Sequence, residues 1–478
     1  MSDKPSSDAP DTNDPQESSS LFTTLNQMTG SVSLRAGLTA ALAMIMLIPL
    51  GMVSSVVSER GYRYQGVINE IASTWGNEQT IAGPVLTVPF TQQVTVTQTI
   101  KGKDGKASEH KKTIEKQRQA HFLPADLQLR TSLAEEFRTR SIFKSIVFQA
   151  NVDVDASFDL PAFDTLAENI TGIHWNKAFI SVGISDTRAI NSVEDFTWNG
   201  QQANLSPGTQ LKSLPSGFHA KLPRSNSAKI KAGEKVRLDK PGVHQLSLRL
   251  SVKGSGGFYF TSHGERTRVS VESSWPHPSF QGATLPTERT ITDEGFHASW
   301  DISHLARNYP QHWVDRQPDL FELTAGVRMF EPNSLYSRIT KATKYGILFI
   351  GLTFLTLFIF ELSIGKRIQF IQFGLIGVSL SLFYLVLLSL SEHIEFYKAY
   401  AAATFTCTTM ISVYTGSVLH SVLRGLFVAV KLFGLYALLY SLVKMEDFAL
   451  LMGTVVLLLV VCVLMVLTRN QSSLLASS

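Results

Sequence analysis

Two ionisable residues inside long apolar runs are the strongest candidates for chemistry in this chain. Lys431 lies about 9 Å into the run 425–443, counted at 1.5 Å per residue, and Glu361 lies near the end of the run 345–365. A charge at such a depth is costly in a membrane and normally faces a partner or water. We interpret Glu361 and Lys431 as a candidate intramembrane polar pair. The alternative is that Lys431 extends its side chain to the headgroups.

Sequence signatures of catalysis and metal binding are absent from the chain. There is no H-E-x-x-H or C-x-x-C pattern, no G-x-S-x-G nucleophile elbow and no phosphate-binding loop. Cys407 and Cys462 lie in apolar runs, where a lone cysteine is usually a small packing residue. We therefore expect no enzymatic activity, no cofactor and no metal site. Four histidines without ligand spacing are expected to be ordinary surface or packed residues: His263, His277, His297 and His304.

Composition indicates a mixture of membrane and soluble parts. The chain has 478 residues, of which 44% are hydrophobic and 17% are charged. That charged fraction is low beside the roughly 25% of a typical globular protein. The net charge of +4 is too small and too scattered to indicate a nucleic-acid partner. The middle of the chain contains no cysteine, so it must fold without disulfide bonds.

Long apolar runs predict six membrane-spanning helices, one before a long soluble region and five after it. Each run has about 20 residues, enough to cross a hydrocarbon core of about 30 Å. The first run is too long for a cleaved signal peptide and lacks an A-x-A site, and Pro49 is expected to kink it. A tail rich in Ser, Asp and Pro (1–33) is expected to be disordered. The predicted spans are 34–58, 345–365, 368–390, 399–419, 425–443 and 448–468, with a second tail at 469–478.

Basic residues in the short loops predict the orientation of these helices. Lysine and arginine in short loops favour the cytoplasmic side of a membrane. The resulting map places both termini in the cytoplasm of a bacterial inner membrane and the large soluble region in the periplasm. The cytoplasmic set is Arg35, Lys366, Arg367, Arg424 and Arg469, whereas the opposite loops hold Lys398 and Lys444. Basic residues that flank the soluble region oppose this count, although such positions set orientation less reliably: Arg60, Arg63, Arg338, Lys341 and Lys344.

The region 84–340 is predicted to be β-rich and sandwich-like. Short runs such as "VFQANVDVDASFDL" and "HQLSLRLSVKG" alternate apolar and polar residues and are separated by Gly, Pro, Asn and Ser, a pattern typical of antiparallel sheets. The stretch 131–143, "TSLAEEFRTRSIF", is the best helical candidate inside it. A break near 159–169 leaves open whether the region forms one sandwich or two smaller β units. The expected fold class is an α+β membrane protein.

A specific junction, 59–83, precedes the β region. Tyr64, Ile68, Ile71 and Trp75 recur at spacings of three or four, which predicts a helix that continues beyond the membrane and ends at Gly76. The following segment, "GNEQTIAGPVLTVPF", is rich in turn residues and then becomes strand-like. We expect a structural role in setting the angle between helix and β region, with the Trp75 ring filling the corner. The residues of this junction are Trp75, Gly76, Gln79, Gly83 and Pro84.

Several segments resemble the CreD family of bacterial inner-membrane proteins. Near the start these are "EIASTWGNEQTIAGPVLTVPF" (70–90) and "FLPADLQLR" (122–130). The C-terminal segments are the most specific: "KATKYGILFIGLTFLTLFIFEL", "LIGVSLSLFYLVLLSLSEHIEFYKAY" and "MEDFALLMGTVVLLLV". The similarity extends from about residue 60 to 469, nearly the whole folded chain.

This resemblance implies a membrane protein of a carbon-source-responsive regulon, linked to cell envelope integrity, colicin tolerance and β-lactam response. It brings no catalytic motif, cofactor or active-site residue to this sequence. The expected function is therefore envelope integrity and stress response, through a periplasmic β domain with the lipid bilayer and an unknown envelope component or ligand as partners. The alternative is a transporter or channel built from the C-terminal helices, which Lys431, Glu361 and the Thr-rich run 399–419 favour.

Overall fold

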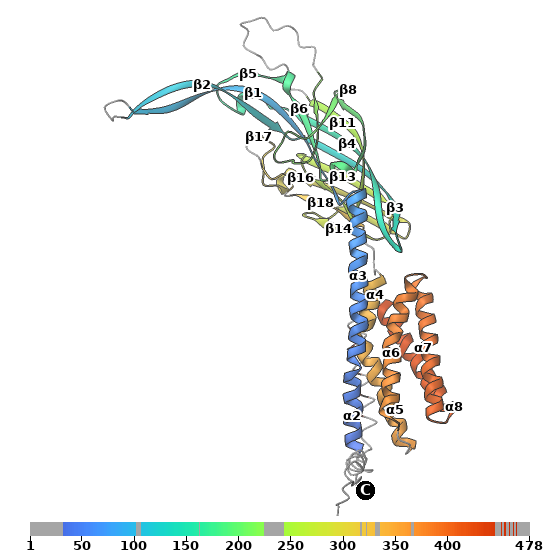
Figure 1. The fold of residues 1–478 in the computed structure, drawn as a ribbon. Coiled ribbons are helices and arrows are strands. Elements are labelled where there is room, and N and C mark those ends of the chain that lie inside the picture. Colours follow the sequence, from blue (N-terminus) through green and yellow to red (C-terminus); the bar gives the residue numbers. More distant parts are fainter. Residues whose placement is uncertain are drawn as a thin grey trace, which may run out of the picture. The chain divides into compact units, whose positions relative to one another are not determined.

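The computed structural model describes residues 32–101, 107–161, 163–223, 243–315, 318–321, 323–329, 335–364 and 368–444, with a few single residues after them. The chain divides into two compact units, which are described separately. A helical unit consists of Met1–Tyr64 and Asn333–Ser478, and a β unit consists of Gln65–Pro332 (Figure 1). The region predicted as 448–468 lies for the most part outside the described residues.

The described strands of the β unit form two sheets. The first has ten strands, in the order β14-β18-β12-β1-β6-β10-β9, with β2, β5 and β17 attached at β1 and β2. These strands are β1 (Gln79–Lys101), β2 (Ala107–Phe122), β5 (Ile170–Ile173), β6 (Phe179–Ile184), β9 (Asn204–Pro207), β10 (Gly217–Lys221), β12 (Gly257–Thr261), β14 (Pro278–Gly282), β17 (His312–Val314) and β18 (Thr324–Met329).

The second sheet has eight strands in the order β15-β16-β13-β3-β4-β11-β7-β8. These strands are β3 (Asp126–Arg140), β4 (Phe143–Asp159), β7 (Ile190–Trp198), β8 (Gln201–Gln202), β11 (Val243–Ser255), β13 (Arg266–Ser273), β15 (Glu288–Thr292) and β16 (Gly295–Ser303). Four short 3₁₀ helices connect strands of both sheets: η1 (Phe163–Thr165), η2 (Trp175–Lys177), η3 (Thr187–Ala189) and η4 (His304–Ala306).

A single hydrophobic core joins the two sheets. Phe90 and Ile180 from the first sheet belong to the same buried cluster as Phe148 and Leu250 from the second. The alternation predicted from the sequence accounts for this core, because every second residue of β4 from Ala150 to Phe158 is buried. The large β-rich region is therefore confirmed, and the core continues across residues 159–169 rather than dividing there. Most strand pairs are antiparallel, but β1–β12 and β13–β3 are parallel.

The helix expected at 131–143 is wrong, because this segment forms most of strand β3 and the start of β4. Alternate residues Leu127, Leu129, Thr131 and Leu133 are buried, which is a period of two. Ala and Glu in this stretch favour a helix, but β3 pairs with β4 along its length and with β13 along half of it. Pairing on both sides outweighs the local preference, which is a weak one.

The first long helical segment, Leu34–Trp75, has a one-residue break three residues before Pro49. Helix α2 (Val32–Ile45) is followed directly by α3 (Leu47–Trp75), with the break at Met46. Proline has no N–H to donate to the carbonyl of Ile45, four residues earlier, and its ring crowds that carbonyl. Helix α3 ends at Trp75, as expected, and β1 begins at Gln79 rather than at residue 84, so part of the predicted junction already belongs to the sheet.

The remaining described helices belong to the helical unit: α4 (Leu335–Lys344), α5 (Gly346–Ile364), α6 (Phe370–Ser391), α7 (Phe396–Val418) and α8 (Val422–Lys444). Three of the described helical segments are long and apolar enough to cross a membrane: Leu34–Trp75, Phe370–Ser391 and Val422–Lys444. A fourth counts if α4 and α5, which bend by 41° at their break, form one span. Helix α7 is 23 residues long, but its threonines and serines make it less apolar than these three. The protein is thus an α+β membrane protein.

Candidate functional site

Trp75, the last residue of α3, is held by the second sheet of the β unit. Its indole Nε1 donates a hydrogen bond to the carbonyl of Phe148 on β4, at 3.3 Å. The guanidinium of Arg138 on β3 lies 4.2 Å from a ring centre of the indole, and the ammonium of Lys253 on β11 lies 4.8 Å away. Such cation–π contacts are favourable, typically by about 0.5–1 kcal/mol each at exposed sites. The ring therefore connects the helix end to three adjacent strands.

Gly76 allows the chain to turn directly after the helix. Its backbone φ of +146° lies in a region that side chains disfavour, and a Cβ here would lie 2.7 Å from the carbonyl oxygen of Lys253. The Gly76 N–H closes the last helical turn on Ala72 at 2.8 Å, and its carbonyl accepts from Ser255 Oγ at 2.7 Å. Glycine is thus required by close backbone packing as well as by its conformation.

The other predicted junction residues lie at the start of β1. Gln79 is fully buried and donates to the carbonyl of Asn77 at 3.0 Å. Gly83 has a φ of +105° and is joined to Pro84 by a cis peptide bond. The N–H of Gly83 donates to Nδ1 of His263, at 2.9 Å. The structure therefore places all five predicted residues in one continuous path from the helix end into the first sheet.

His263 lies at the centre of a buried polar network. Its side chain is fully buried, and the Oγ1 of Thr261 lies 2.8 Å from Nδ1. Arg307, which is 8% exposed, donates from Nη1 to the carbonyl of His263 at 2.5 Å and from Nη2 to Gln311. Burial and, secondarily, the nearby Arg307 charge lower the pKa of His263 to about 3. His263 is accordingly neutral at physiological pH.

A second buried histidine, His121, lies on β2. Thr87 Oγ1 is 3.0 Å from its Nδ1, and the ring of Trp313 stacks near it at 5.5 Å between ring centres. Burial lowers the pKa of His121 to about 4, although the charge of Asp315 partly opposes the shift. Sequence reasoning did not single out His121 or Arg307, because a lone polar residue in an alternating strand pattern carries no sign of its partners.

Among the described residues, no group of three or more His, Cys, Asp or Glu side chains is arranged to hold a metal ion. His263 is buried, His297 lies exposed on β16, and His304 lies in η4. His277 lies between β13 and β14 and contacts Trp275 through its ring, at 5.9 Å between centres. The structure thus does not bring the four histidines of the sequence together.

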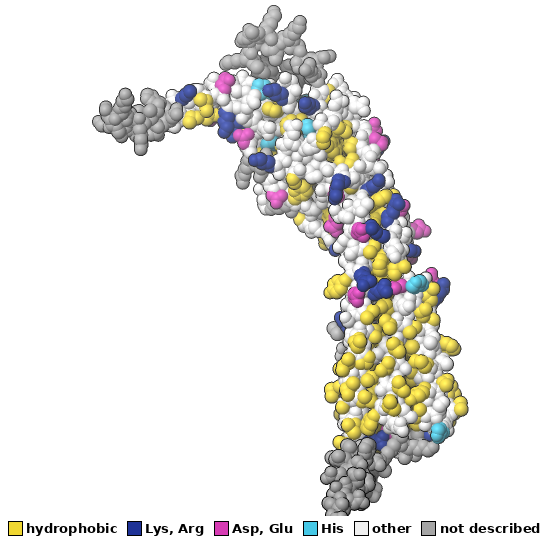
Figure 2. All heavy atoms as spheres, viewed as in Figure 1, with side chains coloured by type: hydrophobic (Ala, Val, Ile, Leu, Met, Phe, Trp, Pro, Cys, Tyr) yellow, Lys and Arg dark blue, Asp and Glu magenta, His cyan; other side chains and the backbone are white. Residues whose placement is uncertain are grey.

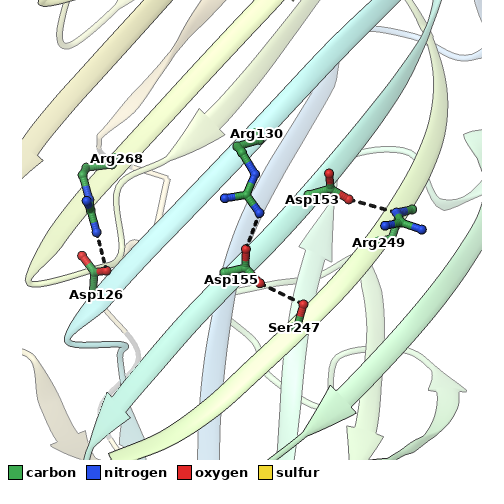
Figure 3. Close-up of polar contacts among 7 residues, drawn as sticks. All are labelled: Asp126, Arg130, Asp153, Asp155, Ser247, Arg249 and Arg268. Carbon is green, nitrogen blue, oxygen red and sulfur yellow. Dashed lines mark hydrogen bonds and ion pairs between the residues drawn. The ribbon is translucent and has the colours of Figure 1, made fainter. Parts of the chain in front are cut away.

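The outer face of the second sheet carries a ladder of ion pairs, drawn in Figure 3. Arg268 pairs with Asp126 at 2.7 Å, Arg130 with Asp155 at 2.6 Å, and Arg249 with Asp153 at 3.0 Å. Ser247 donates a further hydrogen bond to Asp155 at 2.8 Å. These residues alternate with the buried ones along β3, β4, β11 and β13, so they face solvent. Each exposed pair contributes about 0–1 kcal/mol, and each arginine on this face is matched by a carboxylate.

A shallow groove of about 470 Å³ lies elsewhere on the β unit, between η3, β7, β9 and β10. Its lining is mainly apolar, with Ile190, Val193, Leu205, Pro207, Pro215 and Phe218. No titratable side chain lines it. The groove therefore has the chemistry of an apolar contact surface and offers no group for acid–base catalysis.

In the helical unit, the structure gives Glu361 and Lys431 different partners. Glu361 on α5 forms a buried ion pair with Arg35 on α2, and Arg35 also donates to the carbonyl of Ile368 at 3.1 Å. Lys431 on α8 donates to the carbonyl of Leu352 at 2.5 Å and to the hydroxyl of Thr356. Both acceptors lie on α5, the helix to which Glu361 itself belongs. The cation paired with Glu361 is Arg35, from a helix that is distant in sequence.

A second polar cluster joins α3, α4 and α6. Tyr336 donates from its hydroxyl to Glu392 at 3.1 Å, and Arg60 lies 3.9 Å from the same carboxylate. The ring of Tyr64 lies 5.4 Å from that of Tyr336. Glu392 belongs to the short polar loop "SEHIEF" that follows α6, yet its side chain is only 8% exposed. The loop is therefore partly a packing element that holds the helix carrying Arg60.

Comparisons with known proteins agree with the resemblance seen in the sequence. The profile of a family described as "Inner membrane protein CreD" matches residues 31–473. The Inner membrane protein CreD of Escherichia coli (strain K12) is 30% identical over 431 residues, which cover 89% of this chain and 90% of that protein. Two solved structures of an M1 zinc metallopeptidase from Deinococcus radiodurans cover 37% of this chain and 38% of theirs, at 13% and 12% identity, with TM-scores of 0.18 and 0.16. Likeness that slight carries no information about fold or chemistry. The match along nearly the whole chain shows that the protein belongs to the CreD family of inner membrane proteins.

Proposed function

We propose that this protein contributes to cell envelope integrity and stress response through its β unit, held on the periplasmic side of the inner membrane by six spanning helices. In this proposal both termini are cytoplasmic, and the β unit binds a component or ligand of the envelope rather than catalysing a reaction. Membership of the CreD family and the apolar helices support the membrane location. The basic residues of the short loops support the orientation.

The observation that carries this proposal is the position of two charged clusters along the first helical segment. Arg35 pairs with Glu361 near one end of the segment, and Arg60 lies beside Glu392 near the other. They are separated by 25 residues, which span about 38 Å at 1.5 Å per residue. A bilayer with its interfacial regions is about 40–45 Å thick. The clusters therefore match the two faces of a membrane.

Figure 2 shows hydrophobic side chains covering the visible face of the helical unit between charged side chains at its two ends. With Arg35 at the cytoplasmic face, α3 leads out of the membrane at Arg60 and continues to Trp75. The Trp75 and Gly76 contacts then connect this helix firmly to the sheets.

Single cysteines test the orientation. In a Cys462→Ser background, where only the buried Cys407 remains, Thr292→Cys on exposed strand β15 and His420→Cys in the exposed turn after α7 are compared. A membrane-impermeant maleimide should label Thr292→Cys in cells whose outer membrane alone has been permeabilised. It should label His420→Cys only after the inner membrane is broken. The reverse pattern would place the β unit in the cytoplasm and exclude a periplasmic role.

A deletion tests the function itself. Removing residues 79–329 while keeping the helices should leave cells as sensitive to detergent and to cell-wall antibiotics as cells without the protein. Membrane fractionation with an epitope tag is needed to show that the shortened chain is still inserted. If the shortened chain is inserted and the cells remain fully resistant to detergent and antibiotics, the β unit is not needed for envelope integrity.

A transporter or channel is the second candidate, favoured by polar groups buried in the helical unit. Among the described residues, six buried hydroxyls have no hydrogen-bond partner there, on four helices: Thr353, Tyr384, Thr404, Thr408, Ser412 and Tyr436. Together with Lys431 they are an unusual set for a purely anchoring bundle. A pH-sensitive dye trapped in proteoliposomes should report proton flux that Lys431→Met abolishes. Flux that is absent, or unchanged in Lys431→Met, would exclude a proton path through Lys431.

A further inference from the structure

A two-stranded ribbon extends from the β unit, and beyond Gln92 of β1 no third strand among the described residues pairs with it. It consists of Thr91–Lys101 of β1 and Ala107–Arg118 of β2, which pair residue by residue as far as Lys101 with Ala107 (Figure 1). Strand β5 pairs with β1 only as far as Gln92, and β17 pairs with β2 only at Ala120–Phe122. Isolated two-stranded ribbons are at best marginally stable in water. A strand added along either edge would complete a three-stranded sheet.

The outer edge of β1 is open to such an addition. The N–H of Gln93 donates away from β2, to the carbonyl of Asn169 at 3.0 Å, which identifies the direction of this edge. Because backbone groups alternate along a strand, the N–H groups of Thr95 and Thr97 point the same way. Beyond Gln93, no described strand pairs with this edge.

The composition of this edge does not protect it from pairing. Residues 91–100, "TQQVTVTQTI", contain no charge and no proline and are rich in β-branched residues. Exposed edges are usually protected by lysine, proline or a bulge, and an edge without them is a template for another strand. The edge of β1 therefore has the chemistry used when an extended peptide joins a sheet.

The ribbon also carries positive charge, of which only Arg118 forms an ion pair with a carboxylate among the described residues, Asp315. Exposed Lys111, Lys112 and Lys116 form no ion pair with a described residue, unlike the arginines of the second sheet. Residues 91–118 hold seven Lys and Arg against three Asp and Glu, a net charge of +4 that equals that of the whole chain. The strand register places Lys112 directly opposite Val96. Lys116 and Ile114 are two residues apart on β2, so they lie on the same face of the ribbon as this pair. Cations and exposed apolar side chains therefore share one face.

We propose that the outer edge of β1 at Gln93–Thr97 pairs with an extended segment of a partner protein that carries carboxylates. Main-chain hydrogen bonds to Thr95 and Thr97 would hold the segment in register. An added strand would lie about 5 Å from β1 and about 10 Å from β2, within reach of long lysine side chains from β2. This inference depends on the ribbon alone, so it does not require the proposed role in the envelope.

Two other occupants fit the observations less well. A lipid surface is usually entered by Trp, Phe or Leu, and residues 91–118 contain none of them. A second copy paired edge to edge would bring two ribbons of like charge together, which is unfavourable. An acidic segment satisfies both the backbone edge and the lysines.

A matched pair of proline variants tests the edge. Thr95 and Thr113 are directly opposite each other. The backbone N–H and carbonyl of Gln119 contact Asp315, on the side of β2 that faces away from β1. Because backbone groups alternate along a strand, the N–H of Thr113 points to the same outer edge. Thr95→Pro and Thr113→Pro therefore each remove one outward N–H and keep the hydrogen bonds between β1 and β2. Only Thr95→Pro blocks the proposed docking edge.

The probe is a short fluorescein-labelled peptide in which Glu alternates with Val, added to the full chain in zwitterionic nanodiscs. We expect saturable binding by fluorescence anisotropy, weakened at least about tenfold by Thr95→Pro, and less than about twofold by Thr113→Pro. Lys112→Glu with Lys116→Glu should also weaken it and remove its salt dependence. A peptide with Gln in place of Glu should bind more weakly than the Glu peptide, and a peptide with Lys in place of Glu should bind more weakly still.

Several outcomes would overturn the proposal. Equal loss in the two proline variants would show that the edge of β1 has no special role. Equal binding of the Lys peptide would remove the role of charge. If mass photometry detects dimers of the wild-type protein that Thr95→Pro abolishes, the edge of β1 pairs with a second copy of this chain. Binding of vesicles of anionic phosphatidylglycerol, but not of the peptide, would make it a lipid surface.

Discussion

Arg35 and Glu361 form a buried ion pair that joins α2, the first of the described helices, to α5. Glu361 is only 6% exposed, and Arg35 also donates to the carbonyl of Ile368. The two residues lie far apart in the sequence, on either side of the whole β unit. The pair therefore closes the helical unit around the insertion and fixes which face of α2 meets α5.

Removing one member of this pair is expected to destabilise the helical unit strongly. Glu361→Met or Arg35→Met leaves a buried charge without its partner, which typically costs about 3–5 kcal/mol. The double variant Arg35→Met with Glu361→Met should recover most of that loss, because no buried charge remains. Equilibrium unfolding in mixed micelles measures all four proteins in one thermodynamic cycle. Additive losses in the double variant would mean that the pair is not coupled.

Substitution by alanine should affect stability differently at Gly76, just after α3, and at Gly66, inside α3. Gly76→Ala should destabilise the β unit by about 1–3 kcal/mol, because a side chain there is strained at φ +146° and meets the carbonyl of Lys253. Gly66→Ala, inside α3 with no atom within 4 Å of the new methyl, should be neutral or stabilising by up to about 1 kcal/mol. Thermal unfolding followed by circular dichroism distinguishes them. Equal effects would contradict the packing described for Gly76.

Stability should fall as the pH is lowered from about 6.5, the ordinary value for histidine. The pKa values of His121 and His263 are lowered in the folded protein, to about 4 and about 3. Between these values and 6.5 the unfolded chain binds more protons than the folded one, so acid favours unfolding. The loss should begin near pH 6.5 and continue to about pH 4 for His121 and about pH 3 for His263. Urea unfolding of the full chain at pH 7, 6 and 5 measures it.

A histidine variant checks the origin of this pH dependence. His121→Phe should lower stability at pH 7 but reduce its slope with pH between 6.5 and 5. His304→Gln, at a partly exposed position in η4, should leave the slope unchanged. If His121→Phe leaves the slope of stability with pH unchanged, the pH dependence arises from other titratable groups. Carboxylates such as Asp301 and Asp186, whose pKa values lie below normal because of Arg266 and Arg188, act only at lower pH.

Close packing of α7 and α8 depends on a glycine. A Cβ at Gly425 would lie 2.8 Å from the carbonyl of Ser412 and 3.1 Å from Cα of Gly416. Gly425→Val should therefore separate the two helices. We expect it to lower the free energy of unfolding in detergent by about 1–3 kcal/mol, which is measured as a lower midpoint of unfolding. Gly434→Val on the same helix, with no atom within 4 Å, is the control and should have little effect. A loss of the same size in both would show that helix propensity, not packing, is responsible.

How much the sequence predicts depends on the range of the interaction involved. The alternation in β4 and the end of α3 at Gly76 were both predicted correctly, because period and turn chemistry are local properties. Strand β3 was predicted as a helix, because its Ala and Glu residues favour one until pairing with β4 and β13 is known. The partner of Glu361 was missed for the same reason: nothing near Glu361 in the sequence indicates Arg35.

By itself, the sequence determined the succession of membrane and β regions, the sharp junction at Trp75–Gly76 and the family. These follow from runs, periods and residue types within short windows, where apolar burial and backbone conformation act directly. Only the tertiary structure decided that His263 is buried beside Arg307, that Arg35 faces Glu361, and that no described strand pairs with one edge of β1 beyond Gln92. Such relationships arise where distant segments meet, and the free energy of those contacts depends on which groups the fold removes from water together.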